Sequence, residues 1–290
     1  MFLNLHFFRK HSSGKLDYEK LINYFEEQEN FKVFQTSEYV EIKYYDPEFN
    51  FSYRYLITRQ CRVQRLYDLD PMYGNQNFMM ELPLLIPSFL AKEALGGCAN
   101  LCKVFDFAVY SDTFPNVQPF LLVDMLVHFE KEKKRCVAEQ GMQGRMPFNA
   151  DKLNVVCKYQ RKRNILEELY EGIATGKIVP AHDEQYGFSG MTTTWILGTP
   201  LIFPPYTDYF VITNNDLEGQ ATYVLKRDDF FKVFQKRLVE LRSELPDLYM
   251  VKGRQAKKTK KEVKKIKKYS MSEIRFKPLR LCDVIEEERI

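Results

Sequence analysis

No CxxC pair occurs among the six cysteines, which are Cys61, Cys98, Cys102, Cys136, Cys157 and Cys282. Zinc fingers and disulfide frameworks use closely spaced or paired cysteines, so neither is expected. Glycine and proline are sparse, at 13 each in 290 residues, and 45% of the residues are hydrophobic, which excludes a disordered or low-complexity chain. This cysteine usage leads us to expect a reducing, cytoplasmic location.

Long apolar runs are also missing. No stretch approaches the roughly 18 to 20 apolar residues that cross a membrane, so no membrane span is expected. The opening "MFLNLHFFRKHSSGK" is apolar, but its charges follow the apolar run and no small-residue cleavage site closes it. We therefore interpret it as a first β-strand and expect a soluble protein.

Familiar catalytic motifs do not occur. There is no phosphate-binding Gly-Lys loop and no dinucleotide fingerprint. The segment "AHDEQYGFSG" holds His182, Asp183 and Ser189 in one loop, whereas a catalytic triad takes its members from separate elements. We interpret it as a surface turn and predict no catalytic residue and no cofactor. An enzyme with an unfamiliar site around His182 stays as a third hypothesis.

Cys98 and Cys102 lie one helical turn apart, but no other Cys or His pair supplies the remaining ligands of a closed zinc site. We predict no metal site and favour core thiols. Gly96 and Gly97 lie in the same predicted helix, although each glycine there costs about 1 kcal/mol relative to alanine. We interpret the pair as a place where the sheet or another subunit approaches the helix backbone closely.

The first 115 residues alternate strand-like and helix-like patterns. The order of the predicted elements is β-α-β-β-(β)-α-β, which is that of a ferredoxin-like split βαβ sandwich with one added strand, an α+β fold. These elements cover residues 1–8, 16–28, 31–45, 51–59, 77–85, 86–105 and 105–111. Asp17 is the expected cap of the first helix.

The remaining chain predicts three further segments. Two helices, 119–137 and 151–172, are expected to bridge residues 116–175 to a second unit at 176–246. There, β-branched and aromatic runs broken by Gly and Pro predict a small sheet. A helix over 227–245 should complete it, and its buried stripe should contain Phe231, Phe234, Leu238 and Leu241. Residues 247–290 form a basic segment followed by an apolar ending.

Four aromatic residues, Phe49, Phe51, Tyr53 and Tyr55, fall on one face of a predicted strand. An open aromatic face on such a sheet stacks single-stranded bases in RNA-recognition modules. Aromatic stripes are more often core, and we favour that interpretation.

The strongest functional signal is "KGRQAKKTKKEVKKIKK", residues 252–268. It holds ten Lys or Arg residues and one acid, so it carries +9, while the whole chain carries +4 and the rest therefore −5. Dense cations suit a polyphosphate partner, and lysine dominance indicates sequence-independent contact. The residues predicted to bind an anionic partner are Lys257, Lys258, Lys260, Lys261, Lys264, Lys265, Lys267 and Lys268. The alternative is a solvated, partly helical linker.

A second basic patch lies in "CKYQRKRN", where Lys158, Arg161 and Lys162 share one face of a predicted helix. No acid occurs between Lys152 and Arg163. The patch either extends the phosphate-binding surface or is an ordinary wet helix face.

Apolar periodicity returns after the lysines. The residues predicted to dock on protein are Ile274, Phe276, Leu279, Leu281, Val284 and Ile285. Such an ending docks either on its own body or in a groove of a partner, and the sequence leaves both open.

Two main hypotheses follow. The first is a non-enzymatic binding or assembly protein whose basic segment contacts nucleic acid or another anionic surface. The second is a protein-interaction subunit without nucleic-acid contact, in which the lysines hold an acidic protein. The Gly96-Gly97 helix and the apolar ending then form the contacts in a homo- or hetero-oligomer.

Overall fold

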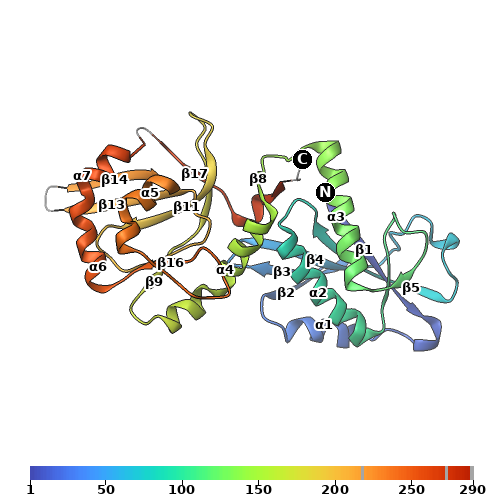
Figure 1. Ribbon diagram of the computed structural model, residues 1–290. Coiled ribbons are helices and arrows are strands. Elements are labelled where there is room, and N and C mark those ends of the chain that lie inside the picture. Colours follow the sequence, from blue (N-terminus) through green and yellow to red (C-terminus); the bar gives the residue numbers. More distant parts are fainter. Residues whose placement is uncertain (217–218, 272–273, 288–290) are drawn as a thin grey trace. The chain divides into compact units, whose positions relative to one another are not determined.

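The structure is a computed structural model that describes residues 1–216, 219–271 and 274–287 (Figure 1). The chain divides into two compact units, residues 1–145 (unit 1) and 146–290 (unit 2). Both units combine sheets with helices, which confirms the expected α+β class. Within the described ranges, no helix combines the length and the apolar character that crossing a bilayer requires.

Unit 1 is built on one antiparallel sheet of seven strands in the order β2-β3-β4-β5-β1-β6-β7. The strands are β1 (Phe2–Lys10), β2 (Phe31–Gln35), β3 (Tyr39–Asp46), β4 (Phe51–Thr58), β5 (Tyr73–Pro83), β6 (Ala108–Tyr110) and β7 (Gln118–Pro119). The helices are α1 (Tyr18–Glu26), α2 (Ser88–Phe105) and α3 (Leu122–Gln140), with 3-10 turns η1 (His11–Ser13) and η2 (Leu66–Asp68). The sheet is larger than expected, and the ferredoxin-like arrangement is not confirmed.

The extra strand at the sheet edge comes from a turn without glycine or proline. Residues 31–45, predicted as one strand, form the hairpin β2–β3. Thr36 makes the turn, because its N–H donates to the carbonyl of Tyr39 and its hydroxyl oxygen accepts from the N–H groups of Glu38 and Tyr39. A threonine turn of this kind gives only a weak sequence signal.

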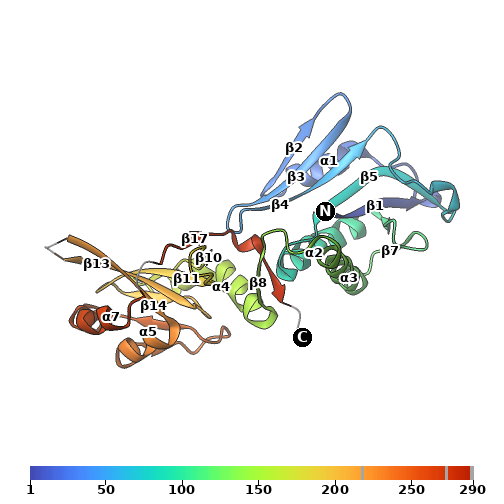
Figure 2. The same cartoon turned by 90° about the horizontal axis from the view of Figure 1, so that it is seen from above.

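The helices of unit 1 bury apolar stripes on the sheet or on each other. Asp17 caps α1 as expected, since its Oδ1 accepts from the N–H of Lys20 at 3.1 Å. Phe25 of α1 packs on Tyr55 of β4, with the ring centroids 4.9 Å apart. α2 and α3 lie side by side, as Figures 1 and 2 show.

All four aromatic residues of the stripe at 49–55 are buried in unit 1. They form part of its core, as the favoured interpretation expects. An open base-stacking face on β4 is therefore excluded for this stripe, because α1 and α2 cover that side of the sheet.

Unit 2 contains three smaller sheets rather than one. Their orders are β14-β13-β11-β10-β17, β15-β16-β12-β9 and β18-β8. The strands are β8 (Met146–Asn149), β9 (Ala174–Thr175), β10 (Val179–His182), β11 (Ser189–Ile196), β12 (Leu201–Phe203), β13 (Tyr209–Asp216), β14 (Gly219–Lys226), β15 (Val239–Glu240), β16 (Tyr249–Val251), β17 (Lys277–Pro278) and β18 (Val284–Glu287).

The helices of unit 2 are α4 (Ala150–Leu169), α5 (Arg227–Phe234), α6 (Gly253–Lys258) and α7 (Val263–Tyr269). Its 3-10 turns are η3 (Gln235–Arg237), η4 (Thr259–Glu262) and η5 (Leu281–Asp283). The two helices expected to bridge the units fall in different units, because α3 packs on α2 whereas α4 contacts β8, β9 and β18.

The core of unit 2 is aromatic. Trp195 of β11 lies edge-on to Phe203 and Phe234, at centroid distances of 5.2 and 5.1 Å, and its Nε1 donates to the carbonyl of Thr199 at 3.0 Å. Phe210 stacks on Phe230 of α5 at 3.6 Å. These contacts fix α5 on the five-stranded sheet.

The prediction of a helix over 227–245 is wrong beyond Phe234. α5 ends there, η3 follows, and Val239 pairs with Met250 in β15–β16. The N–H of Leu241 donates to the carbonyl of Leu248 at 2.8 Å, which continues this hairpin. Pairing with a distant strand thus overrides a helical apolar pattern.

Candidate anion-binding surface

The basic segment of unit 2 is helical over almost its whole length. α6, η4 and α7 follow one another over residues 253–269, which we call the lysine arm. The backbone stays right-handed at both junctions, with φ −63° and ψ −25° at Thr259 and φ −51° and ψ −39° at Val263. Lysine, alanine, glutamine and glutamate dominate the arm and are strong helix formers. The segment is therefore a folded helical element and not a linker.

One side of the lysine arm is buried against the core of unit 2. Ala256 and Ile266 have no exposed surface and belong to the same apolar cluster as Trp195 and Phe234. Thr259 lies between them, is also fully buried, and donates its hydroxyl proton to the carbonyl of Ala256 at 2.5 Å. Truncating a buried isoleucine typically costs about 2–5 kcal/mol. Packing therefore holds the arm in place.

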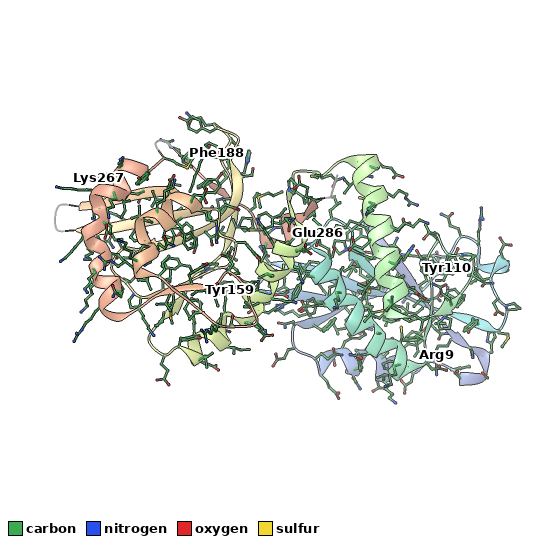
Figure 3. All side chains as sticks on the ribbon, in the orientation of Figure 1. Arg9, Tyr110, Tyr159, Phe188, Lys267 and Glu286 are labelled. Carbon is green, nitrogen blue, oxygen red and sulfur yellow. The ribbon has the colours of Figure 1, made fainter. Side chains whose placement is uncertain are left out.

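The other side of the arm is basic. Figure 3 shows Lys267 extending outward from α7. All eight lysines predicted to contact an anionic partner are exposed here: Lys257, Lys258, Lys260, Lys261, Lys264, Lys265, Lys267 and Lys268. From the first to the last the arm rises roughly 16 Å, so the charge density is high. We call this surface the lysine face.

Glu262 is the single acid of the arm, and it is engaged on both sides. Lys265 Nζ lies 2.7 Å from its Oε2, and Arg237 Nη2 lies 3.4 Å from its Oε1. The hydrogen bond from Lys265 is the main reason why the pKa of Glu262 is lowered. Glu262 therefore neutralises the charge of Lys265 and connects the arm to η3 through its ion pair with Arg237.

The other lysines of the face keep their charge uncompensated. Within residues 1–216, 219–271 and 274–287, none of the other seven forms a salt bridge with a carboxylate. The stem of Lys260 instead packs over Gly198, where an added Cβ would lie 2.7 Å from Lys260 Cε. A lysine stem on apolar surface with its ammonium group in water is a common arrangement.

The second basic patch is separate from the lysine face. Lys158, Arg161 and Lys162 lie on α4, a different helix from α6 and α7, which carry the lysine face. Lys162 pairs with Glu244, and this hydrogen bond, with the charges of Lys162 and Lys158, lowers the pKa of Glu244. The structure therefore does not join the two patches into one phosphate-tracking surface.

The apolar ending docks on its own unit. Leu281, Val284 and Ile285 are buried, and β18 pairs in parallel with β8. Leu279 donates its N–H to the carbonyl of Pro180 at 2.7 Å, and Phe276 packs on a neighbouring ring. Ile274 is partly exposed. Of the two alternatives that the sequence leaves open, intramolecular docking is the one that this structure contains.

The polar side chains of the loop around His182 make hydrogen bonds that stabilise the fold. His182 Nδ1 lies 2.7 Å from Ser189 Oγ, because the two residues face each other across the β10–β11 hairpin. The carboxylate of Asp183 accepts from the backbone N–H groups of Tyr186 and Arg275, and these bonds lower its pKa. Asp183 thus anchors the C-terminal segment and does not orient His182.

Cys98 and Cys102 are both buried in unit 1, and burial raises the pKa of the Cys98 thiol. Among the described residues, no group of three or more His, Cys, Asp or Glu side chains is placed to hold a metal ion.

The sheet does not approach the helix backbone closely at Gly96 and Gly97, and the approach of another subunit stays a prediction. No heavy atom lies within 4 Å of a Cβ built on Gly96, and at Gly97 the nearest is Tyr53 Oη at 4.0 Å. Gly97 instead lines a pocket of unit 1, which the sequence interpretation missed. The sequence signal for this pocket was the glycine itself, because glycine inside a helix lowers stability and so needs another reason to be there.

No protein-family model matches this chain, and no curated protein or solved structure is similar enough to it to count as a match.

Proposed function

We propose that this protein binds nucleic acid through the lysine face, without reading base sequence. The single observation that carries the proposal is the two-sided arm: its apolar side is locked into the core of unit 2 and its other side carries eight exposed lysines. A fixed row of cations loses less conformational entropy when it binds phosphates than a mobile tail does. Binding would then release condensed counterions.

Lysine rather than arginine makes the contact electrostatic and tolerant of sequence. An ammonium group is a point charge, whereas base reading in the major groove typically uses the bidentate guanidinium fork. Because the lysines curve around the exposed side of a helix, about four or five reach one phosphate backbone at a time. The expected slope of log K against log salt is then about −4 on duplex DNA.

The test is a fluorescence-anisotropy titration of generic single- and double-stranded DNA over a salt series. One variant changes Lys257, Lys261, Lys264 and Lys268 to Gln, which preserves helix propensity and removes four charges. The matched control changes Lys15, Lys20, Lys32 and Lys43 of unit 1 to Gln, all of them exposed. We expect at least a tenfold loss of affinity at low salt in the first variant and less than a twofold loss in the control.

Equal losses in both variants, or binding that does not depend on salt, would overturn the proposal. Binding of poly-glutamate in preference to DNA would instead identify an acidic protein as the partner. A chain cut after residue 250 is unsuitable for this test, because the cut removes Ala256 and Ile266 from the core of unit 2 as well as the charges.

A further inference from the structure

The unit 1 sheet ends in a strand that has a neighbour on one side only. Among the described residues, β2 pairs with β3 and forms one border of the sheet, as Figure 2 shows. The strand at the other border, β7, is only Gln118–Pro119, and its proline has no N–H to offer a further strand. β2 is longer, contains no proline, and pairs with β3 without a register shift. It therefore lacks most of the features by which proteins protect a sheet edge.

The pairing with β3 identifies the backbone groups that face the open edge. In an antiparallel pair, every second residue bonds to the neighbouring strand, and the residues between them point away. Tyr45 of β3 donates its N–H to the carbonyl of Asn30, just before β2, at 2.9 Å. The even-numbered residues of β2 therefore bond to β3. The N–H and C=O groups of Phe31, Val33 and Gln35 point to the open edge.

Packing holds β2 in place. The ring of Phe31 lies 5.1 Å from that of Phe25 on α1 and 5.1 Å from that of Tyr44 on β3, between centroids. Successive side chains of a strand alternate between its faces, so Lys32 and Phe34 lie on the opposite face of the sheet. Both are exposed there, Phe34 to 48%. The edge therefore combines a fixed backbone with side chains that are available for contact.

We propose that β2 forms a symmetric dimer by pairing antiparallel with β2 of a second copy of this chain. With the two-fold axis at Val33, the edge groups of Phe31 meet those of Gln35 of the second copy, and Val33 meets its own counterpart. Each N–H that faces the edge then donates to a carbonyl of the other strand. Contacts of this two-fold kind are the commonest in homo-oligomers.

Charge and register favour a second copy as the occupant of this edge. With the axis at Val33, Lys32 of one copy lies opposite Phe34 of the other, so the ammonium group meets a ring and not another cation. An axis at Lys32 would place two lysines directly opposite each other. An axis at Phe34 would place Phe31 beyond the end of the second strand. β2 is therefore complementary to itself in the register that uses its whole length.

The first experiment measures self-association of the full chain by sedimentation equilibrium, from about 5 to about 500 μM protein. A dissociation constant of about 10–100 μM is expected, because pairing through one short strand buries less area than a standard interface. A chain that stays monomeric over this whole range would overturn the proposal.

Hydrogen exchange of single amides, measured by NMR, tests which groups pair. Raising the protein concentration over the same range should slow exchange at Phe31, Val33 and Gln35 at least threefold. Lys32 and Phe34 already donate to β3, so exchange at these two amides should change less than twofold. Protection that does not alternate in this way would contradict pairing at the edge of β2.

Variants of the edge test the register. Val33→Pro removes an N–H that points away from β3, and edge strands tolerate proline, so the dissociation constant should rise at least tenfold while unit 1 stays folded. Phe34→Lys places two cations opposite each other and should raise it about fivefold. Phe34→Glu places an acid opposite Lys32 of the second copy and should leave it unchanged or lower it. Tyr45→Lys is the matched control, since Tyr45 is exposed on the same face but lies on β3, and it should change the constant less than twofold.

The two Phe34 variants change only an exposed side chain, so they test the proposal even where Val33→Pro does not fold. Equal weakening by Phe34→Lys and Phe34→Glu, or no weakening by Val33→Pro and Phe34→Lys, would contradict the pairing at Val33. A blocked Glu-Val-Glu-Val-Glu peptide tests the other occupant. Protection of the same amides by this peptide, in a chain that stays monomeric, would assign the edge to an acidic strand of another protein and overturn the dimer.

Discussion

The two units of this protein are assembled in different ways. In unit 1, strands β2 to β5 follow one another in the chain and lie next to one another in the sheet, so neighbours in sequence are neighbours in space. In unit 2, β18 near the C-terminus pairs with β8 at the start of the unit, and β17 pairs with β10. Unit 2 is therefore closed by its last residues, whereas unit 1 is complete without them.

The units also differ in the shape and the side chains of their most distinctive surfaces. The lysine face of unit 2 is a convex, exposed row of cations, which suits an extended polyanion. The pocket of unit 1 is concave, aromatic and lined by carboxylates. The comparison teaches that lysines of the chain gather on one surface of unit 2, whereas the described lining of the unit 1 pocket includes no Lys, Arg or His.

The largest expected effect comes from cutting the chain after residue 250. This removes the lysine arm, β17 and β18, so unit 2 should lose its fold while unit 1 keeps it. Trp195 is the single tryptophan of the chain and is 1% exposed, so its fluorescence should shift to the red. Hydrogen exchange should show that protected amides persist in unit 1. A buried Trp195 in the shortened chain would disprove that the ending closes unit 2.

A smaller effect is expected from Ile266→Ala. The side chain is fully buried beside the core of unit 2, so its truncation should lower the free energy of unfolding of that unit by about 2–5 kcal/mol. Lys264→Ala, on the exposed side of the same helix, should change it by less than about 0.5 kcal/mol. Urea unfolding followed by Trp195 fluorescence measures both. Similar effects of the two substitutions would mean that the arm is not packed on the core.

The smallest effect concerns His6 of unit 1. Burial lowers its pKa below 6.5, and this outweighs the opposing charges of Asp112 and Glu81, while Arg62 adds to the lowering. Near pH 6.5 the imidazole of His6 therefore binds a proton in the unfolded chain but stays neutral in the folded unit. The free energy of unfolding keeps its full value above pH 6.5 and decreases as the pH falls below it. One proton changes the free energy of unfolding by at most about 1.4 kcal/mol per pH unit.

Urea unfolding of unit 1 at pH 7.5 and 5.5, followed by the near-ultraviolet circular dichroism of its tyrosines, measures this dependence. His6→Gln should reduce the difference between the two pH values. An identical pH dependence in the variant would assign the effect to other groups.

In unit 1, the elements whose pattern lies within one short segment of the sequence were predicted well. The strand predicted at 1–8, the helix capped by Asp17 and the long helix α2 are all present, the strand as Phe2–Lys10. The hairpin at Thr36 was missed, because a threonine turn without glycine or proline resembles a continuous strand. The helix over 227–245 was extended too far, because the pairing of Val239 with Met250 depends on a strand elsewhere in the chain.

The sequence by itself determined the α+β class, the buried aromatic stripe of β4 and the concentration of lysines at 257–268, because composition and short-range periodicity carry that information. Only the tertiary structure decided that the lysines lie on a packed helix, since Ala256, Thr259 and Ile266 become an inner face only when a core is present to bury them. It likewise decided that the space beside Gly97 is a pocket. Such a space is formed by side chains from α1, α2 and three strands, and no local pattern contains them together.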